Sequence, residues 1–171
     1  MFPVIIFRWL GILAILFSLC LLVPAAASDF EMADRVLIKK SERKLFLMKK
    51  DRILKSVDIS LGLVPTGDKL SEGDFRTPEG RYKLTERNPA SDFFLSILIS
   101  YPNGSDDREA ERVGLSPGGQ IMIHGQPNSP SHSPDYYRWT DWTDGCVAVS
   151  NSNMVDIWLM TDNNTPIDIL P

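Results

Sequence analysis

Short β-prone runs alternate with polar turns along most of the chain. VLIKK (36–40) and KLFLMKK (44–50) flank Ser41-Glu42-Arg43, which predicts a hairpin, and a third run follows at 52–62. Three consecutive short strands favour an antiparallel sheet. Further strands are predicted at 81–87, 93–100, 120–125, 146–150 and 165–170.

The rest of the pattern predicts two short helices and one long loop. Residues 105–113 have Asp106 and Glu109 at the spacing of a capping box, and 153–161 place Trp158 in an apolar stripe, most simply as a core residue. Residues 62–80 carry four glycines and two prolines, which predicts a long and functional loop. Many short strands with one or two helices indicate a mostly-β sandwich or barrel-like fold.

The first 27 residues have the order of a secretory signal peptide. Arg8 precedes an apolar run that ends at Val23, and Ala25-Ala26-Ala27 supplies a small-residue cleavage site. The run is shorter than the roughly 18–20 residues of a good membrane span, and an uncleaved anchor is the alternative. Bulky Leu19 before Cys20 disfavours a lipid anchor. We therefore expect export to the cell envelope, with membrane contact only if the segment is retained.

Cleavage after Ala27 would leave Cys146 as the only cysteine and rule out an internal disulfide. An unpaired thiol in an exported protein is intermolecular, reactive, or a small buried hydrophobe. Cleavage also leaves 17 basic residues against 22 acidic ones, a net charge of −5. A chain this acidic, with no basic run, is a poor nucleic-acid binder.

Cys146 and His124 have the residue types of a thiol nucleophile and its base. A thiol needs a base to form thiolate and to pass a proton to a leaving amine. His124 ends a strand and precedes Gly125, which permits close approach of another chain, whereas His132 lies in a Ser/Pro-rich loop. Gly145 lets consecutive amides point at one spot, where they can stabilise an oxyanion. The alternatives are a core histidine and an inert cysteine. The spacing does not suit a metal site.

The motifs around these residues resemble a known family. IHG (123–125) followed by TDGCVAV (143–149) is similar to the signature of the L,D-transpeptidase (YkuD-type) catalytic domain: His-Gly after a strand, then Ser/Thr-x-Gly-Cys. GDFRTPEGRYKLTERN resembles the family's Thr-Pro-x-Gly-x-Tyr/Phe segment. The run ISYPNGSDDREAERVGLSPGGQIMIHGQPN and the Asp-Trp-Thr-Asp-Gly-Cys motif resemble a branch of small exported members. The resemblance covers about residues 34–171, as one catalytic domain.

This resemblance implies a β-sandwich of mixed sheets with one or two short helices, a cysteine at its rim, and a periplasmic location. Cys146 would attack the diaminopimelate carbonyl of a peptidoglycan tetrapeptide stem, release D-Ala and form a thioester. An amine from a second stem or from a protein lysine would resolve it. Carbapenems are the expected inhibitors, and no metal or organic cofactor is implied.

The resemblance also implies roles for the residues around the thiol. His124 would be the general base, and Gly125 or its carbonyl would hold the imidazole. Thr143 and Gly145 would shape the cysteine turn, with the amides of residues 144–146 as oxyanion donors.

Two positions depart from the family pattern. Asp144 stands where many members have His, and its charge would raise the thiol pKa unless it is paired, with Arg138 as one candidate partner. Ala148 stands where many members have Arg or Asn, which removes a polar group for the stem peptide. Both departures leave open which acceptor resolves the thioester.

The segment between His124 and Cys146 contains PDYYRWTDW. A lid or sugar-facing platform for the substrate could be formed by its aromatic residues Tyr136, Tyr137, Trp139 and Trp142. Arg138 could pair with a substrate carboxylate or with Asp144. The alternative is an exposed loop that its aromatic residues pin to the sheet. Lys69 and Arg76 could meet stem carboxylates, although exposed charges are usually solvated.

Two other functions stay open. Water could resolve the same thioester, which would make the protein an L,D-carboxypeptidase or an endopeptidase. A non-catalytic wall-binding module is the alternative from another class, but it has no need for Cys146, His124 and Gly145 together. A papain-like or NlpC-like peptidase is disfavoured because its cysteine precedes its histidine.

Overall fold

The computed structural model describes residues 31–171, so the predicted signal peptide at 1–27 lies outside the described residues. The strands are β1 (Arg35–Lys39), β2 (Lys44–Lys49), β3 (Arg52–Asp58), β4 (Gly80–Ser91), β5 (Phe94–Ile99), β6 (Met122–His124), β7 (Val147–Ala148) and β8 (Pro166–Leu170). The helices are α1 (Gly104–Arg112), α2 (Pro134–Trp139) and α3 (Asn151–Met160). None of the helices in this part of the chain is both long and apolar enough to cross a membrane.

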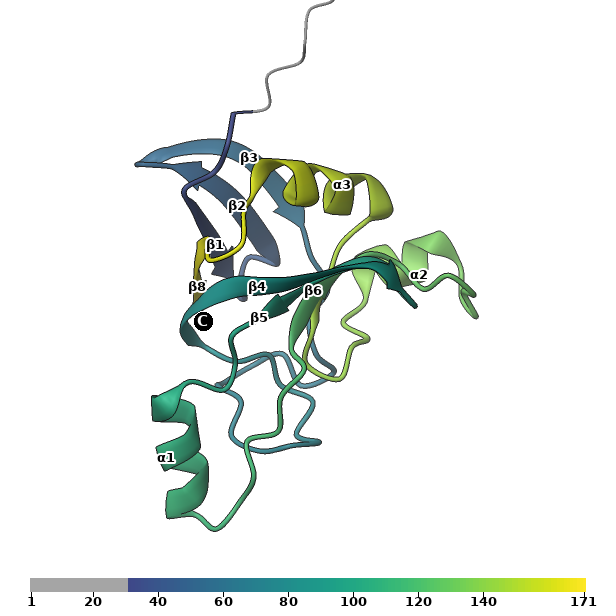
Figure 1. The fold of residues 1–171 in the computed structure, drawn as a ribbon. Coiled ribbons are helices and arrows are strands. Elements are labelled where there is room, and N and C mark those ends of the chain that lie inside the picture. Colours follow the sequence, from purple (N-terminus) through teal and green to yellow (C-terminus); the bar gives the residue numbers. More distant parts are fainter. Residues whose placement is uncertain (1–30) are drawn as a thin grey trace, which may run out of the picture.

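The strands of residues 31–171 form one mixed sheet in the order β3-β2-β1-β8-β4-β5-β6-β7. β1 pairs with β8, and β6 with β7, in parallel, while the other neighbours are antiparallel. The long β4 belongs to both halves, because its first residues pair with β8 and its later ones with β5. In Figure 1, β4 to β6 run across the middle of the molecule, below β1 to β3, and α3 lies over the top.

Both halves of the sheet contribute to one apolar core. Its fully buried residues include Val36, Ile38, Leu45 and Leu47 from the first half and Ile97, Ile99, Ile123 and Val147 from the second. Burial of apolar surface is the main favourable term in folding. The predicted mostly-β sandwich with mixed strand directions is confirmed.

The segment after β3 connects the two ends of the sheet. Ser60 and Ala148 exchange two backbone hydrogen bonds of 2.9 Å each, and Gly62 forms a parallel bridge with Thr143. The amides of Trp142 and Thr143 both donate to the carbonyl of Leu61 at 3.1 Å. The chain around residue 146 is therefore held between β6 and residues 60–62.

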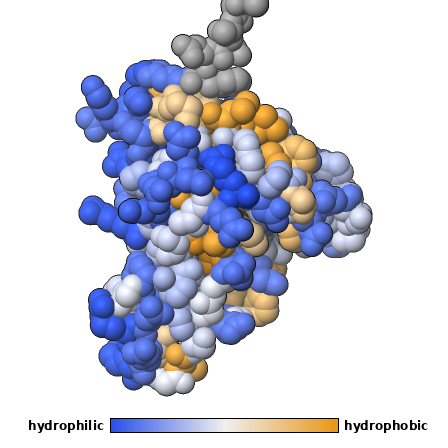
Figure 2. All heavy atoms as spheres, viewed as in Figure 1, coloured by the Kyte–Doolittle hydropathy of each residue, from blue (hydrophilic) through white to orange (hydrophobic). Residues whose placement is uncertain are grey.

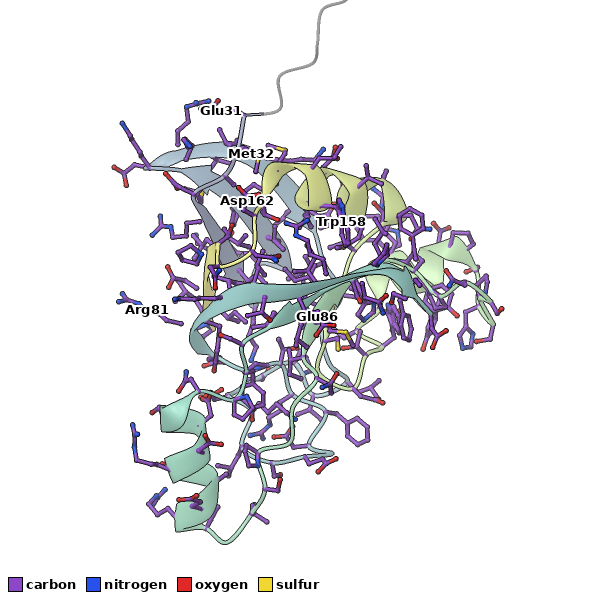
Figure 3. The ribbon with its side chains drawn as sticks, viewed as in Figure 1. Glu31, Met32, Arg81, Glu86, Trp158 and Asp162 are labelled. Carbon is purple, nitrogen blue, oxygen red and sulfur yellow. The ribbon has the colours of Figure 1, made fainter. Side chains whose placement is uncertain are left out.

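Helix α3 covers one side of the core with Met154, Ile157 and Met160. Trp158 lies between α3 and β4 (Figure 3), partly buried, with the Arg87 guanidinium carbon 4.9 Å from its ring centre. The prediction that Trp158 packs on the core is confirmed. The outer side of α3 stays apolar, and Figure 2 shows hydrophobic residues gathered over it.

Two helix predictions were wrong in detail. The capping box of α1 uses Asn103 and Asp106 instead of Asp106 and Glu109: Asn103 Oδ1 accepts from the Ser105 amide at 2.7 Å, and Asp106 accepts from the Asn103 amide at 2.7 Å. Helix α2 was predicted as a loop. Ser133 caps it and Pro134 occupies its first turn, where a missing amide proton costs nothing.

Candidate active site

His124 and Cys146 are carried by neighbouring parallel segments. The register of β6 and β7 pairs Ile123 with Val147 and His124 with Ala148. Ile123 and Val147 are fully buried in the core. Because side chains alternate along a strand, Cys146, His124 and Ala148 share the opposite face. The structure thus brings the two predicted residues to one end of one sheet face.

The tautomer of His124 follows from its hydrogen bond. Its Nδ1 lies 2.8 Å from the carbonyl oxygen of Gly125, which can only accept, so Nδ1 carries the proton and Nε2 is the acceptor nitrogen. His124 is 2% exposed, and burial lowers its pKa although the bond to Gly125 opposes that change. Its ring centre lies 4.5 Å from that of Phe93 and 5.6 Å from that of Trp142. The imidazole is therefore neutral at neutral pH.

Gly125 is needed for close packing at the end of β6. A Cβ atom there would lie 2.6 Å from Oδ1 of Asn151 and 3.0 Å from the carbonyl oxygen of Phe93. Asn151 Oδ1 also accepts from the Gln126 amide at 2.7 Å, which ties the chain after His124 to the start of α3. Two other segments of the same chain therefore approach Gly125 closely.

The thiol of Cys146 is partly buried. Its Sγ lies 3.6 Å from the carbonyl oxygen of Gln120, and the backbone of Met122 also hydrogen-bonds to it. Burial raises the pKa of Cys146, and the charge of Asp144 raises it further, while the Met122 amide and the charge of Lys69 act in the opposite direction. The net direction is upward, so the thiol is neutral at neutral pH.

Thr143 and Gly145 shape the turn before Cys146. The Thr143 hydroxyl donates to the Cys146 carbonyl at 2.7 Å and accepts from the Gly145 amide at 3.2 Å. Gly145 has φ +127°, and a Cβ there would lie 2.6 Å from the carbonyl oxygen of Arg76. The prediction that all three amides of residues 144–146 can serve an oxyanion needs correction, because the Gly145 amide is already bonded. Within residues 31–171, the amides of Asp144 and Cys146 make no hydrogen bond.

The predicted pair of Arg138 and Asp144 does not form. Asp144 is exposed, and the Arg138 guanidinium carbon lies 4.6 Å from the ring centre of Trp139. No ion pair joins Arg138 to Asp144 in the part of the chain that the structure describes. Asp141 makes the ion pair of this segment instead, since Arg43 Nη2 lies 2.7 Å from its Oδ2. The charge of Asp144 is thus not offset by Arg138.

The aromatic residues of segment 126–142 divide into two groups. Tyr137 is buried, its hydroxyl accepts from the Ser131 amide at 3.0 Å, and its carbonyl accepts from the Trp142 indole at 3.2 Å. Together with the contact between Trp142 and His124, these bonds pin the segment to the sheet. Trp139 is 66% exposed, and Arg138 is exposed beside it.

A cleft of about 650 Å³ lies beside this segment. Its wall includes Ser60, Tyr137, Arg138, Ala148 and the first residues of α3, but neither His124 nor Cys146. A second cleft of about 410 Å³ shares Ser60 and Arg138 and adds Trp139. The candidate substrate contacts Tyr137, Arg138 and Trp139 therefore line clefts near the strand that follows Cys146, and Trp142 lines a third of about 280 Å³.

The sequence did not reveal the burial of Lys69. Its charge suggests a solvated side chain, but that side chain is 3% exposed and its Nζ lies 2.8 Å from Oδ1 of Asp74. The Arg76 guanidinium donates to the Asp68 carbonyl at 3.3 Å. The sequence GDKLSEGD (67–74), with acidic residues on both sides of Lys69, is the only sequence signal for the Lys69–Asp74 ion pair.

The chain belongs to the L,D-transpeptidase catalytic domain (YkuD) family, whose model matches residues 33–169. Membership supports an enzyme of the L,D-transpeptidase kind. No curated protein matches the chain.

Several solved structures resemble the chain. The K307A mutant of the helical cell shape determining protein Pgp2 from Campylobacter jejuni is 28% identical, with a TM-score of 0.60 over 82% of this chain and 47% of that one. Bd1075 from Bdellovibrio bacteriovorus is 26% identical, with a TM-score of 0.54 over 82% of this chain and 51% of that one. The L,D-transpeptidase LdtMt1, solved with imipenem, shares the fold at 13% identity and a TM-score of 0.51, over 79% and 57%. The chain spans about half the length of these proteins.

Proposed function

We propose that the protein is a peptidoglycan L,D-transpeptidase that works through a cysteine acyl-enzyme. The observation that carries the proposal is the placement of His124 and Cys146 on one sheet face, within a domain of the L,D-transpeptidase family. The buried His124, with Nδ1 fixed on Gly125, has the tautomer that a general base needs. The substrate we propose is the tetrapeptide stem, attacked at its diaminopimelate carbonyl.

The lowered pKa of His124 and the raised pKa of Cys146 indicate how acylation proceeds. Both groups rest neutral, so Nε2 of His124 takes the thiol proton as Sγ of Cys146 attacks the carbonyl carbon. The new S–C bond forms a tetrahedral oxyanion, for which the amides of Asp144 and Cys146 are the proposed donors. The imidazolium then gives its proton to the leaving D-Ala nitrogen as the C–N bond breaks, which leaves a thioester.

The second step reverses the proton transfers. An acceptor amine loses a proton to His124 as it attacks the thioester carbon, and the Cys146 sulfur leaves and takes that proton back. The clefts lined by Arg138 and Trp139 are the proposed surface for the stem peptides, because Arg138 can pair with a stem carboxylate. Because LdtMt1 was solved with imipenem, we also propose that carbapenems acylate Cys146.

We further propose that the protein acts in the periplasm or cell envelope after loss of residues 1–27. The support is the order of charge, apolar run and small residues at the N-terminus. A role in cell shape is consistent with the likeness to Pgp2. Mass spectrometry of the exported protein should find Ser28 at the N-terminus, and a chain that keeps residues 1–27 in the membrane fraction would refute cleavage.

The test of the function is incubation with purified tetrapeptide-stem muropeptides, followed by mass spectrometry of the products. Crosslinked dimers with release of D-Ala are the expected result. Tripeptides without dimers would replace transfer by hydrolysis of the same thioester. Unchanged muropeptides that are nevertheless retained by the protein would favour a wall-binding module and contradict the proposal. The Cys146→Ala variant is the matched control, since it removes only the thiol.

A further inference from the structure

The segment 68–76 folds around one buried ion pair. Lys69 Nζ donates to Oδ1 of Asp74 at 2.8 Å and to the Ser71 carbonyl at 3.0 Å. The Asp74 carboxylate also accepts from the amides of Leu70 at 2.8 Å, Ser71 at 3.1 Å and Arg76 at 3.0 Å. Burial by itself would raise the pKa of Asp74, but the bonds from Lys69 and these amides hold it below its usual range. A buried pair is stable only when its remaining hydrogen-bonding sites are filled in this way.

The same segment packs against the cysteine turn. The Arg76 carbonyl oxygen occupies the space that a Cβ of Gly145 would need, at 2.6 Å. The preceding carbonyl, that of Phe75, would lie 2.1 Å from a Cβ at Gly62, and Phe75 itself has φ +58°. The Glu72 amide donates to the Ser116 carbonyl at 2.9 Å. Ser116 lies shortly before Gln120, whose carbonyl oxygen faces the Cys146 thiol. Residues 68–76 therefore form a wall of the candidate site, and Asp74 sets its shape.

We propose that Lys69 is a positioning residue of this site, which fixes the 68–76 wall through Asp74 and so keeps its positive charge close to the cysteine turn. The inference rests on the proposed role of Cys146 as nucleophile. Two charges act directly on the thiol: Asp144 raises the pKa of Cys146, and Lys69 lowers it. The Asp74 carboxylate, 2.8 Å from Lys69 Nζ, screens part of the Lys69 charge. His124 on the neighbouring strand is neutral and adds no charge at rest.

A second buried lysine, which follows β1 and binds the same loop, provides a matched control. Lys40 is 2% exposed, and its Nζ donates to the carbonyls of Gly67 at 2.6 Å and Thr77 at 2.8 Å and to Glu79 Oε1 at 2.8 Å. It holds the 62–80 loop to the end of β1. Lys40 is absent from the groups that shift the pKa of Cys146, so its loss should affect stability alone.

The test is the pH dependence of iodoacetamide alkylation at Cys146 in the full chain, with the Cys146 peptide quantified by mass spectrometry. For Lys69→Met the profile should move to higher pH, with alkylation at neutral pH slower by roughly two- to fivefold. Lys69→Arg should follow the wild type, and Asp144→Asn should move the profile to lower pH. Lys40→Met should melt earlier with an unchanged profile. A Lys69→Met profile that superimposes on the wild type, or an equal shift in Lys40→Met, would overturn the inference.

If Lys69→Met does not fold, Asp74→Asn decides the question. It leaves the Lys69 ammonium without its carboxylate, so the alkylation profile should move to lower pH, and an unmoved profile would overturn the inference. Alkylation needs no stem peptide. Failure of the muropeptide assay with the expected alkylation shifts would therefore reject the proposed function alone, and the converse result would reject the role of Lys69 alone.

Discussion

At the scale of single residues, the resting state of the site is a neutral pair. Burial lowers the pKa of His124 and raises that of Cys146, so proton transfer from sulfur to nitrogen is unfavourable before a substrate arrives. A thiolate–imidazolium pair would need the opposite shifts. The thiol is thereby kept from unproductive reactions, and the oxyanion donors and the incoming carbonyl must drive the transfer.

His124→Gln should reduce turnover on muropeptides by roughly 10²–10⁴-fold, the usual value of a positioned base.

The stability of the folded protein should also depend on pH through His124. The unfolded chain binds a proton at His124 below about pH 6.5, whereas the buried native imidazole stays neutral, so native stability is lost as pH falls below that value. Melting temperatures of the wild type between pH 7 and pH 5 should therefore fall more steeply than those of His124→Gln. A variant that melts early but keeps its turnover per folded molecule would show that His124 is a core histidine.

At the scale of elements, the site depends on backbones that approach closely. The end of β6 meets the start of α3 at Gly125, and the cysteine turn meets the 68–76 wall at Gly145. Neither approach leaves room for a side chain. The cysteine turn is held at both ends by the segment after β3, because Ser60 pairs with Ala148 of β7 and Gly62 pairs with Thr143 before the turn.

Gly125→Ala should destabilise the fold by about 1–3 kcal/mol, since the added methyl overlaps Asn151 Oδ1 and must displace it or the strand end. Chemical denaturation measures this change. Gly104→Ala in α1 is the control, because a Cβ there meets only the end of the flexible Arg108 side chain at 3.4 Å, and its stability should hold or rise. Equal stability of Gly125→Ala and the wild type would show that the strand end is not tightly packed.

The sequence could predict the strands because their apolar residues alternate, and residue type and motif spacing single out Cys146 and His124 as candidates. It could not predict the three-residue shift of the capping box, since Asp106 is a good residue both at the cap and in the first turn. Helix α2 was missed because its six residues are too short for a periodic pattern. The ion pairs of Arg43 with Asp141 and Lys69 with Asp74 depend on tertiary packing and on loop geometry that local propensity does not encode.

At the scale of the whole molecule, one sheet both contributes the apolar core and carries the candidate residues His124 and Cys146. β4 links the two halves, and the segment after β3 returns to β7, so the candidate site lies where the two ends of the sheet meet. The long connections at this place, residues 62–80 and 126–142, provide the wall and the clefts. The chain spans about half the length of Pgp2 and Bd1075 and shares with them the fold that carries this site.

The covalent intermediate at Cys146 tests the proposed function most directly. The protein is mixed with a tetrapeptide-stem muropeptide, quenched in acid, digested and examined by mass spectrometry. We expect an adduct on the Cys146 peptide with the mass of the stem minus D-Ala, absent from Cys146→Ala and accumulated when the side-chain amine of the stem's diaminopimelate is blocked, so that the stem cannot act as acceptor. Release of D-Ala by Cys146→Ala at the wild-type rate, or an adduct on any other residue, would contradict it.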